Sequence, residues 1–423
     1  MILPSLPSMP RVYLTLVFAF AALPALLHMP ISIFTLSGIG VLAGWLGCGV
    51  LAASLILMVR DPALSARLGG LERMYSWHHR LGVLAYVFLL AHPILLASHA
   101  FALNPQSAWA VLSPSSQTWP SVLGWVALLG LMIGLGATFV TRLRYRVWRP
   151  LHALLSLAVL LGIGHVLVLD GFSVALGLVM ASVALALGWR ILRANRGQGA
   201  RPYEVTAVSR ISDEVAEVSL HALAQPLTAA PGQFVMAAFF EGPSYQGCGE
   251  YHPYTLSDMR SDGSLRLSIK ALGDCTRHIQ TLEAGVAARI QGPFGEFFAS
   301  RDTSPELWIA GGVGVTPFLA LLRMGEVTRP TEFIYVYRAK RDACYLGEME
   351  SYAATHPLLH FHPIVSQDDP SLLYAQLVQI VDLAGRQAYL CGPPPLVAAV
   401  CTWLKQHGMP AQSIHFEKFE FRS

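Results

Sequence analysis

Four histidines lie in apolar stretches of the sequence, two in each stretch. His78 and His92 are 14 positions apart, and His152 and His165 are 13 positions apart. At 1.5 Å per helical residue each pair would span about 20 Å, most of the roughly 30 Å hydrocarbon thickness of a bilayer. Two helices that each offer one imidazole at each level predict two bis-histidine haem sites, a ligation suited to electron transfer.

The other interpretation is that these histidines only hydrogen-bond neighbouring helices, but four of them in paired register favour ligands. The second pair also departs from an ideal helix. Fourteen steps of 100° bring His92 to within about 40° of His78, whereas 13 steps leave His165 about 140° from His152. The sequence therefore predicts either irregular winding just before His165 or a helix that presents its two histidines on different flanks.

The composition is that of a membrane protein. The 423-residue chain is 54% hydrophobic and 13% charged, with a mean hydropathy of +0.49, which excludes an ordinary soluble protein. The long apolar runs end before a polar linker at residues 193–201, after which the sequence is typical of a soluble α/β protein. Six spanning helices are predicted at about residues 12–29, 37–59, 79–98, 121–141, 151–169 and 172–192.

Arginines gather at alternate ends of these spans, and residues 28–36 and 99–120 contain neither Lys nor Arg. This pattern predicts that both termini are cytoplasmic, in a bacterial inner membrane. His78 and His152 would then lie near the cytoplasmic face, and His92 and His165 near the outer face. The six cysteines show no C-x-x-C and no paired spacing, so no iron–sulfur cluster, structural zinc or disulfide is expected.

The second half of the chain changes its periodicity. Short alternating runs between residues 204 and 270 predict an antiparallel β-barrel. From Leu307 a strand, a glycine turn and a helix follow one another, which predicts a parallel sheet flanked by helices. We therefore expect a multi-domain membrane protein: a six-helix transmembrane bundle at 1–196, a β-barrel domain at 197–300 and an α/β nucleotide-binding domain at 301–423.

Several motifs carry a family resemblance. His252-Pro-Tyr-Thr-Leu-Ser257 resembles the flavin-binding signature of the ferredoxin–NADP reductase superfamily, in the form found in NADPH oxidases and ferric reductases. Ile269-Lys-Ala-Leu-Gly-Asp-Cys-Thr276 is similar to the flavin-diphosphate segment of that family. Gly292-Pro-Phe-Gly295, Gly311–Pro317 and Cys391-Gly-Pro-Pro-Pro-Leu396 resemble its remaining signatures, in the correct order.

The membrane half carries the same resemblance. Trp77-His-His-Arg-Leu-Gly82 is similar to the start of the third helix of the ferric reductase transmembrane domain, and that register selects His78 over His79 as the ligand. The resemblance covers nearly the entire chain. It implies a flavocytochrome b of the NADPH oxidase and ferric reductase type, with FAD, two b-type haems and NADPH or NADH as cofactors.

The resemblance also implies roles for individual residues. The expected FAD contacts are His252, Pro253, Tyr254, Thr255, Ser257, Lys270, Gly273 and Thr276, and the expected nucleotide contacts are Gly311, Gly312, Gly314, Thr316, Pro317, Arg338, Gly392 and Pro393. Cys391 opens the signature that would flank the nicotinamide, and Glu417 is a further catalytic candidate. Phe419, two positions after Glu417, would cover the flavin, with Phe421 as second choice. Arg338 favours NADPH through a 2′-phosphate contact, although a solvated basic loop explains it nearly as well.

The expected activity is electron transfer from cytosolic NAD(P)H through FAD and the two haems to an acceptor on the outer side, either dioxygen, giving superoxide, or a ferric chelate. Residues 99–120 contain no carboxylate and no basic residue, so no iron-binding site is evident there. His28 and His99 could polarise an acceptor. A membrane reductase of quinone or of a periplasmic protein, and a haem-based sensor, are the alternatives.

Overall fold

The computed structural model describes residues 9–113, 115, 117–140, 143, 145–299, 301–366 and 371–417. The chain forms two compact units. One consists of Met1–Arg60 and Arg67–Arg196, and the other of Asp61–Ala66 and Gly197–Ser423. Each unit has hydrophobic clusters of its own.

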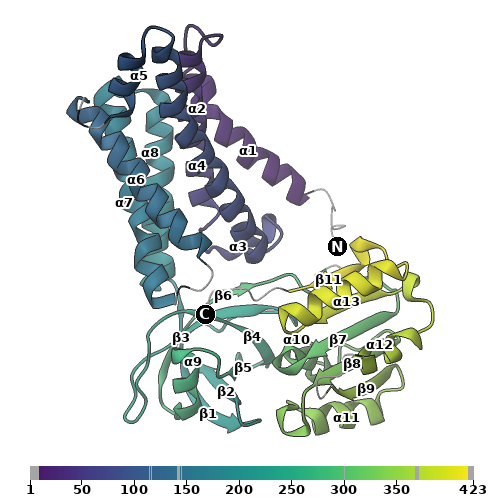
Figure 1. Ribbon diagram of the computed structural model, residues 1–423. Helices are drawn as coiled ribbons and strands as arrows, with labels where there is room; N and C mark the ends of the chain where they lie inside the picture. Colours follow the sequence, from purple (N-terminus) through teal and green to yellow (C-terminus); the bar gives the residue numbers. More distant parts are fainter. Residues whose placement is uncertain are drawn as a thin grey trace. The chain divides into compact units, whose positions relative to one another are not determined.

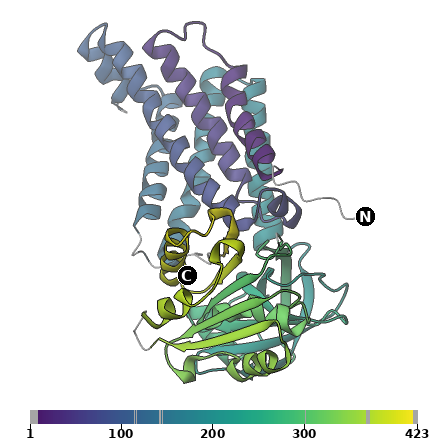
Figure 2. The same ribbon diagram turned by 90° about the vertical axis from the view of Figure 1, so that its right-hand side faces the viewer.

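The first unit is helical (Figure 1). Its helices are α1 (Met9–Leu27), α2 (Leu36–Ile56), α3 (Pro62–Arg67), α4 (Leu71–Phe101), α5 (Pro105–Leu112), α6 (Trp119–Phe139), α7 (Tyr145–Asp170) and α8 (Val174–Trp189), with α3 shared between the units and α8 followed by a π-helical turn over Arg190–Asn195. Figures 1 and 2 show the long helices running side by side, with α2 beside α4 and α6 beside α7.

Five of the described helices are long and apolar enough to cross a membrane: Leu36–Ile56, Leu71–Phe101, Trp119–Phe139, Val147–Asp170 and Val174–Asn195. The remaining expected span, at about residues 12–29, corresponds to α1, whose apolar stretch among the described residues, Val12–Leu27, is shorter. Small residues let the helices approach one another closely, because a Cβ on Gly47 of α2 would lie 2.6 Å from Leu89 Cγ of α4.

The second unit begins with a closed antiparallel barrel. Its strands are β1 (Arg201–Arg210), β2 (Val215–Ala222), β3 (Phe234–Phe239), β4 (His252–Met259), β5 (Leu265–Lys270) and β6 (Ala287–Phe294), in the order β1-β2-β5-β4-β3-β6. Helix α9 (Asp274–His278) follows β5. Val218, Leu256 and Leu267 are among the fully buried side chains that alternate into the barrel core.

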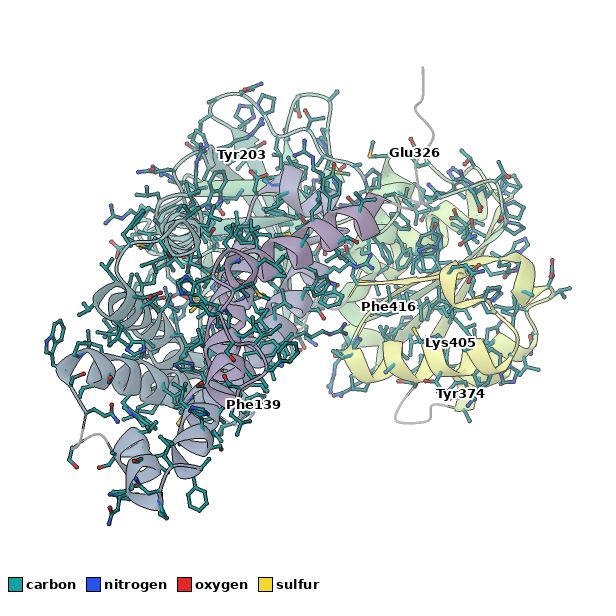
Figure 3. All side chains as sticks on the ribbon, turned by 90° about the horizontal axis from the view of Figure 1, so that it is seen from above. Phe139, Tyr203, Glu326, Tyr374, Lys405 and Phe416 are labelled. Carbon is teal, nitrogen blue, oxygen red and sulfur yellow. The ribbon has the colours of Figure 1, made fainter. Side chains whose placement is uncertain are left out.

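A five-stranded parallel sheet completes the unit, in the order β11-β10-β7-β8-β9. The strands are β7 (Glu306–Gly311), β8 (Thr331–Tyr337), β9 (Leu359–Val365), β10 (Gln387–Cys391) and β11 (Ile414–Phe416), and the helices are α10 (Thr316–Arg323), α11 (Leu346–Thr355), α12 (Ser371–Val378) and α13 (Pro394–Gln406). Helices α10 and α11 share one hydrophobic cluster with the sheet, whereas α12 and α13 share the other. Figure 3 labels Tyr374 of α12 and Lys405 of α13 on that second face.

From β7 the chain adds β8 and β9 on one side of the sheet, and then β10 and β11 on the other, so the direction of winding changes between β7 and β10. In open α/β sheets this switch point is where a nucleotide binds, at the carboxyl ends of the strands. The predicted fold class, an apolar helical domain followed by an antiparallel barrel and a parallel-sheet domain, is confirmed.

Candidate redox site

The two histidines of α4 both face α2. Nδ1 of His78 lies 2.8 Å from the Ser54 carbonyl oxygen and 2.9 Å from Ser54 Oγ, and Nδ1 of His92 lies 2.8 Å from the Gly40 carbonyl oxygen. Because a carbonyl oxygen can only accept a hydrogen bond, Nδ1 carries the proton in both rings. Nε2 then keeps its lone pair, and its orientation is fixed for a metal.

The two histidines of α7 face α6 in a similar way. Nδ1 of His165 lies 2.8 Å from the Pro120 carbonyl oxygen, whereas Nδ1 of His152 lies 3.2 Å from Thr138 Oγ1. That hydroxyl donates to the Gly134 carbonyl oxygen, so it accepts from His152. Helix α7 is one continuous α-helix from Tyr145 to Asp170, so the expected irregular winding before His165 is not observed, and both of its histidines contact α6.

The spacing between opposed rings fits a metal ion. The ring centroids of His78 and His152 are 6.5 Å apart. Two metal–nitrogen bonds of about 2 Å occupy about 4 Å, and the offset of each nitrogen from its ring centre takes up the remainder. The separation of His78 and His152 therefore fits bis-histidine ligation of one metal ion, and His92 and His165 stay a predicted second pair.

Glycines on α2 and α6 make room for the rings of the second level, a role that sequence analysis missed. A Cβ on Gly124 would lie 2.8 Å from Cε1 of His165, and one on Gly44 would lie 3.0 Å from Nδ1 of His92. Each glycine lies four positions after its acceptor carbonyl, at Pro120 and Gly40. The same four-residue spacing occurs in two separate apolar spans, and this repetition in the sequence could have indicated the role of the two glycines.

Strand β4 carries the expected flavin contacts. By the two-residue period of a strand, His252 and Tyr254 lie on one face and Pro253, Thr255 and Ser257 on the other. Tyr254 is 7% exposed and packs in the barrel core, and burial holds the pKa of its hydroxyl well above the ordinary value, with Cys248 acting in the same direction. The flavin roles of these residues stay predictions.

The expected diphosphate segment forms a tight turn at α9. Thr276 Oγ1 accepts hydrogen bonds from the amide nitrogens of Leu272 and Gly273, at 2.9 and 2.8 Å, and donates to the Gly273 carbonyl oxygen at 3.1 Å. The hydroxyl thus builds the turn, while the space around Gly273 is open to a Cβ or to a ligand. Lys270 ends β5 and forms an ion pair with Glu214 at 3.3 Å.

At the switch point two glycine turns pack directly on each other. A Cβ on Gly392 would lie 3.0 Å from the Gly311 nitrogen, and one on Gly314 would overlap the carbonyl oxygen of Cys391. Gly312 has a φ of +55° with open space around it. These glycines therefore serve the packing of β7 against β10 as well as any close approach by a nucleotide.

Helix α10 begins directly after this turn. Pro317 lies in its first turn, where a missing amide hydrogen costs nothing. Thr316 Oγ1 donates to the Val313 carbonyl oxygen at 3.1 Å, and Thr316 is buried. The helix N-terminus leaves main-chain donors that suit a phosphate group. Pro393 directly precedes α13 beside the same crevice.

The remaining predicted site residues differ in their exposure to solvent. Arg338 is exposed directly after β8, and Cys391 is buried at the end of β10. Glu417 is buried, and a Cβ on Gly295 would lie 3.0 Å from its Oε1, so the carboxylate lies against the Gly292–Gly295 signature. Phe419 and its alternative Phe421 lie outside the described residues.

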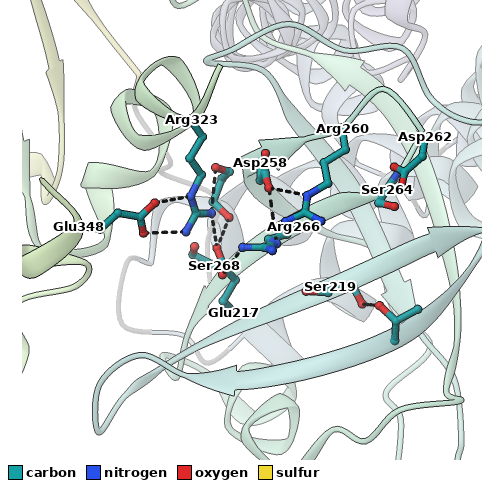
Figure 4. Close-up of polar contacts among 12 residues, drawn as sticks. Glu217, Ser219, Asp258, Arg260, Asp262, Ser264, Arg266, Ser268, Arg323 and Glu348 are labelled. Atoms are coloured by element: carbon teal, nitrogen blue, oxygen red, sulfur yellow. Dashed lines mark hydrogen bonds and ion pairs between the residues drawn. The ribbon is translucent and has the colours of Figure 1, made fainter. Parts of the chain in front are cut away.

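A buried charge network that sequence analysis missed connects β2 and β4 to α10 (Figure 4). Arg323, the last residue of α10, contacts Glu217 of β2 at 2.7 Å and both carboxylate oxygens of Glu348 at 2.8 and 2.9 Å, and it donates to the Ser257 carbonyl oxygen at 3.3 Å. Burial opposes its charge, but the bonds to Glu348 and Glu217 raise the pKa of Arg323 above its ordinary value. Ser257 Oγ donates to Glu217 as well.

Comparison with known proteins assigns three domains. Residues 43–163 match the ferric reductase like transmembrane component, residues 201–311 match an FAD-binding domain, and residues 308–402 match an oxidoreductase NAD-binding domain.

Individual relatives match the second half of the chain. The reductase component of the naphthalene 1,2-dioxygenase system of Pseudomonas putida is 26% identical over 211 residues, which are 47% of this chain and 62% of the relative. The toluate 1,2-dioxygenase electron transfer component of Pseudomonas putida is 27% identical over 51% of this chain and 66% of the relative. The chain thus spans just under two thirds of these two proteins.

Among solved structures, the cytochrome P450 reductase GcoB of Amycolatopsis has a TM-score of 0.46 and 26% identity, covering 53% of this chain and 71% of that chain. The order of the three matched domains is more informative, because an integral membrane part precedes an FAD-binding and an NAD-binding part. The chain therefore has the domain architecture of the NADPH oxidase and ferric reductase family.

Proposed function

We propose that this protein is a transmembrane NAD(P)H-dependent oxidoreductase that passes electrons through FAD and two b-type haems to an acceptor on the outer side of a bacterial inner membrane. Both termini lie in the cytoplasm, so His78 and His152 hold the inner haem and His92 and His165 hold the outer one. NADPH is the preferred donor because Arg338 lies exposed after β8, where a 2′-phosphate would sit.

The observation that carries the proposal is the anchoring of all four imidazoles. Each Nδ1 is held by an oxygen of a neighbouring helix, at 2.8 Å in three rings and at 3.2 Å in His152. An interhelical hydrogen bond alone would not need opposed rings at the same level. The 6.5 Å between the rings of His78 and His152 supports ligation instead.

The bound cofactors would supply the redox chemistry, since FAD takes up two electrons from a nicotinamide and releases them one at a time to haem. The protein positions these groups. The switch-point turns and the N-terminus of α10 hold the nucleotide phosphates, and β4 with the Gly273 turn holds the flavin. The fixed Nδ1 protons set the orientation of the four ligand nitrogens.

The acceptor is dioxygen or a ferric chelate. At the outer end of the bundle Nε2 of His28 lies 2.9 Å from Asp170 Oδ2, and the His28 ring packs 4.6 Å from that of Trp45. His28 and Asp170 thus form a carboxylate–imidazole pair at this end of the bundle, although the loop at residues 99–120 has no carboxylate of its own. The pair could donate a proton or contact a polar acceptor.

Turnover of the purified, haem-loaded protein tests the acceptor. It should be measured with FAD and with each nicotinamide, both in air and without oxygen. Dye reduction that superoxide dismutase suppresses identifies an oxidase, whereas anaerobic trapping of ferrous iron identifies a metalloreductase. NADPH should give the higher kcat/KM of the two nicotinamides, and the Arg338→Ala variant should lose that preference.

Substitution of the outer ligands tests the haem path. His92→Leu and His165→Leu should each remove about half of the haem and stop electron transfer to an outer acceptor, while reduction of the inner haem continues. Val87→Leu, at an exposed position of the same helix, is the matched control. Unchanged haem content and unchanged electron flow in both ligand variants would refute the assignment.

A further inference from the structure

Three potential metal ligands meet next to β4. Cys248 lies in the loop after β3, His252 is the first residue of β4, and Cys275 lies in α9. Their ligand atoms all lie within 4.8 Å of one another, and Cys248 Sγ is 3.8 Å from His252 Nε2. All three side chains are half-buried, so an ion could reach them from solvent. Their separation in the sequence, without any C-x-x-C, is why spacing alone did not predict a site.

The arrangement suits a tetrahedral ion with sulfur and nitrogen ligands. Zinc–sulfur bonds of about 2.3 Å and zinc–nitrogen bonds of about 2.0–2.1 Å place neighbouring ligand atoms roughly 3.5–3.8 Å apart. The observed 3.8 Å between Cys248 Sγ and His252 Nε2 already matches this separation. Two thiolates also balance the charge of a divalent cation, which suits a half-buried position.

Two buried tyrosines close to this cluster in the sequence give a second observation. Among the described residues, neither the Tyr245 hydroxyl nor the Tyr254 hydroxyl has a hydrogen-bond partner, although the two residues are only 1% and 7% exposed. The ring centroids of Tyr254 and His252 are 6.5 Å apart, and Tyr245 lies three residues before Cys248. Buried donors normally find an acceptor, and a metal-bound thiolate is a strong one.

We propose that Cys248, His252 and Cys275 bind one Zn²⁺ ion, with the fourth position open to water. Binding releases the two thiol protons to solvent, because only thiolates coordinate the ion. No electron is transferred in this step.

The zinc site overlaps the flavin site, an inference that rests on the proposed function. His252 opens the flavin signature, and Cys275 lies within the segment proposed to hold the FAD diphosphate. An ion held between β4 and α9 occupies the His252 imidazole, so this side chain can no longer contact a flavin. Zinc and FAD therefore exclude each other, and zinc inhibits by keeping the protein free of flavin.

The test uses the full-length, haem-loaded protein, freed of FAD and kept reduced. Calorimetric titration with Zn²⁺ should show one site per chain. X-ray absorption at the zinc edge, which haem iron does not obscure, should show two sulfur ligands at about 2.3 Å and nitrogen at about 2.0–2.1 Å. A shell of only nitrogen and oxygen would overturn the proposal.

Variants separate this site from adventitious thiol binding. Cys248→Ser and Cys275→Ser should each weaken zinc binding at least tenfold and remove one sulfur from the spectrum. The control is Cys401→Ser, which changes another cysteine of the same unit, on α13. Equal affinities in all three variants would overturn the proposal.

Competition with FAD tests the overlap separately. The FAD-saturated protein should bind Zn²⁺ at least tenfold more weakly than the flavin-free protein. Sulfur-ligated zinc binding that FAD leaves unchanged would confirm the metal site and refute the overlap. A protein that binds zinc but never binds FAD would refute the proposed function while leaving the metal site intact.

Discussion

In the helical unit the candidate ligand histidines are positioned by hydrogen bonds to uncharged oxygens. In the second unit the end of α10 is positioned by buried ion pairs. His92 and His165 form hydrogen bonds with the carbonyl oxygens of Gly40 and Pro120, respectively. The end of α10 is fixed instead by Arg323 between two carboxylates. The two units thus solve the same positioning problem with different chemistry.

The difference follows from the surroundings. A charged pair inside a bilayer is costly, but a helix carbonyl retains a second lone pair that can accept another hydrogen bond. Glycine then matters, because only a missing side chain lets an imidazole reach that carbonyl. At the barrel, two carboxylates pair with Arg323, so charge can provide the attachment there.

The largest expected effect comes from closing the space beside a histidine. In Gly124→Ala the new Cβ would lie 2.8 Å from Cε1 of His165, so the ring must move. We expect loss of about half of the haem and a fall in electron flow to the outer acceptor of at least tenfold. Haem content and low-spin electron paramagnetic resonance signals measure this.

Gly136→Ala is the control on the same helix, because its Cβ would meet nothing within 4 Å. Gly44→Ala should have a smaller effect than Gly124→Ala, since its Cβ would lie 3.0 Å from the His92 ring. If Gly124→Ala matched Gly136→Ala, glycine would have no part in positioning the ligand.

The next largest effect is expected in the ion network. Arg323→Ala removes the 2.7 Å partner of buried Glu217, which keeps only Arg266 at 3.5 Å, and breaking a buried pair costs about 3–5 kcal/mol. The matched control is Arg210→Ala, whose partner Asp213 is 75% exposed and which should cost only about 0–1 kcal/mol. The urea midpoint for release of FAD from the full chain measures both, and equal midpoints would contradict a structural role for the network.

A smaller effect is expected when the hydrogen-bond partners of His152 and His78 are changed one at a time. Thr138→Val removes the hydroxyl that accepts from His152, so haem affinity should fall about 10- to 100-fold. Ser54→Ala keeps the carbonyl oxygen that His78 uses, so its effect should be several times smaller. Haem-transfer titration compares the two, and a larger loss in Ser54→Ala would show that the hydroxyl, not the carbonyl, positions His78.

The smallest effect is a pH dependence confined to the second unit. Burial lowers the pKa of His415 below its ordinary 6.5, although Asp302 and Glu306 act in the opposite direction. The folded protein therefore keeps His415 neutral while the unfolded chain takes up a proton, so stability falls as the pH drops below 6.5. The urea midpoint should fall less on acidification in His415→Gln. An identical acid response would rule out His415 as its source.

Local pattern predicted the domain types well. Apolar length gave the long helices, and alternation gave the barrel strands, because both periodicities are properties of short segments. The resemblance at His252–Ser257 and Gly311–Pro317 likewise concerns contiguous residues. The ends of α4 differ from the prediction by up to eight residues, since Leu71–Arg80 is helical without being uniformly apolar.

Contacts between distant segments could not be read in this way. Ser54 and His78 are 24 positions apart, and Glu217 and Arg323 are 106 apart. Nothing in either segment indicates its partner, because the register between two helices or two domains is decided by packing. The cluster of Cys248 and Cys275 was missed for the same reason, whereas the shared spacing of Gly40 and Gly44 with Pro120 and Gly124 was visible but not recognised.

Helix α10 acts as a spacer of fixed length. It starts at the glycine turn of the nucleotide crevice and ends at Arg323, which is tied to β2 and to the flavin strand. One inserted residue would turn Arg323 by about 100° and move it about 1.5 Å along the axis, away from Glu217. The length of α10 therefore sets the distance between the Gly311–Pro317 turn and β4, so a residue inserted in a loop beside α10 should be tolerated better than one inserted within α10.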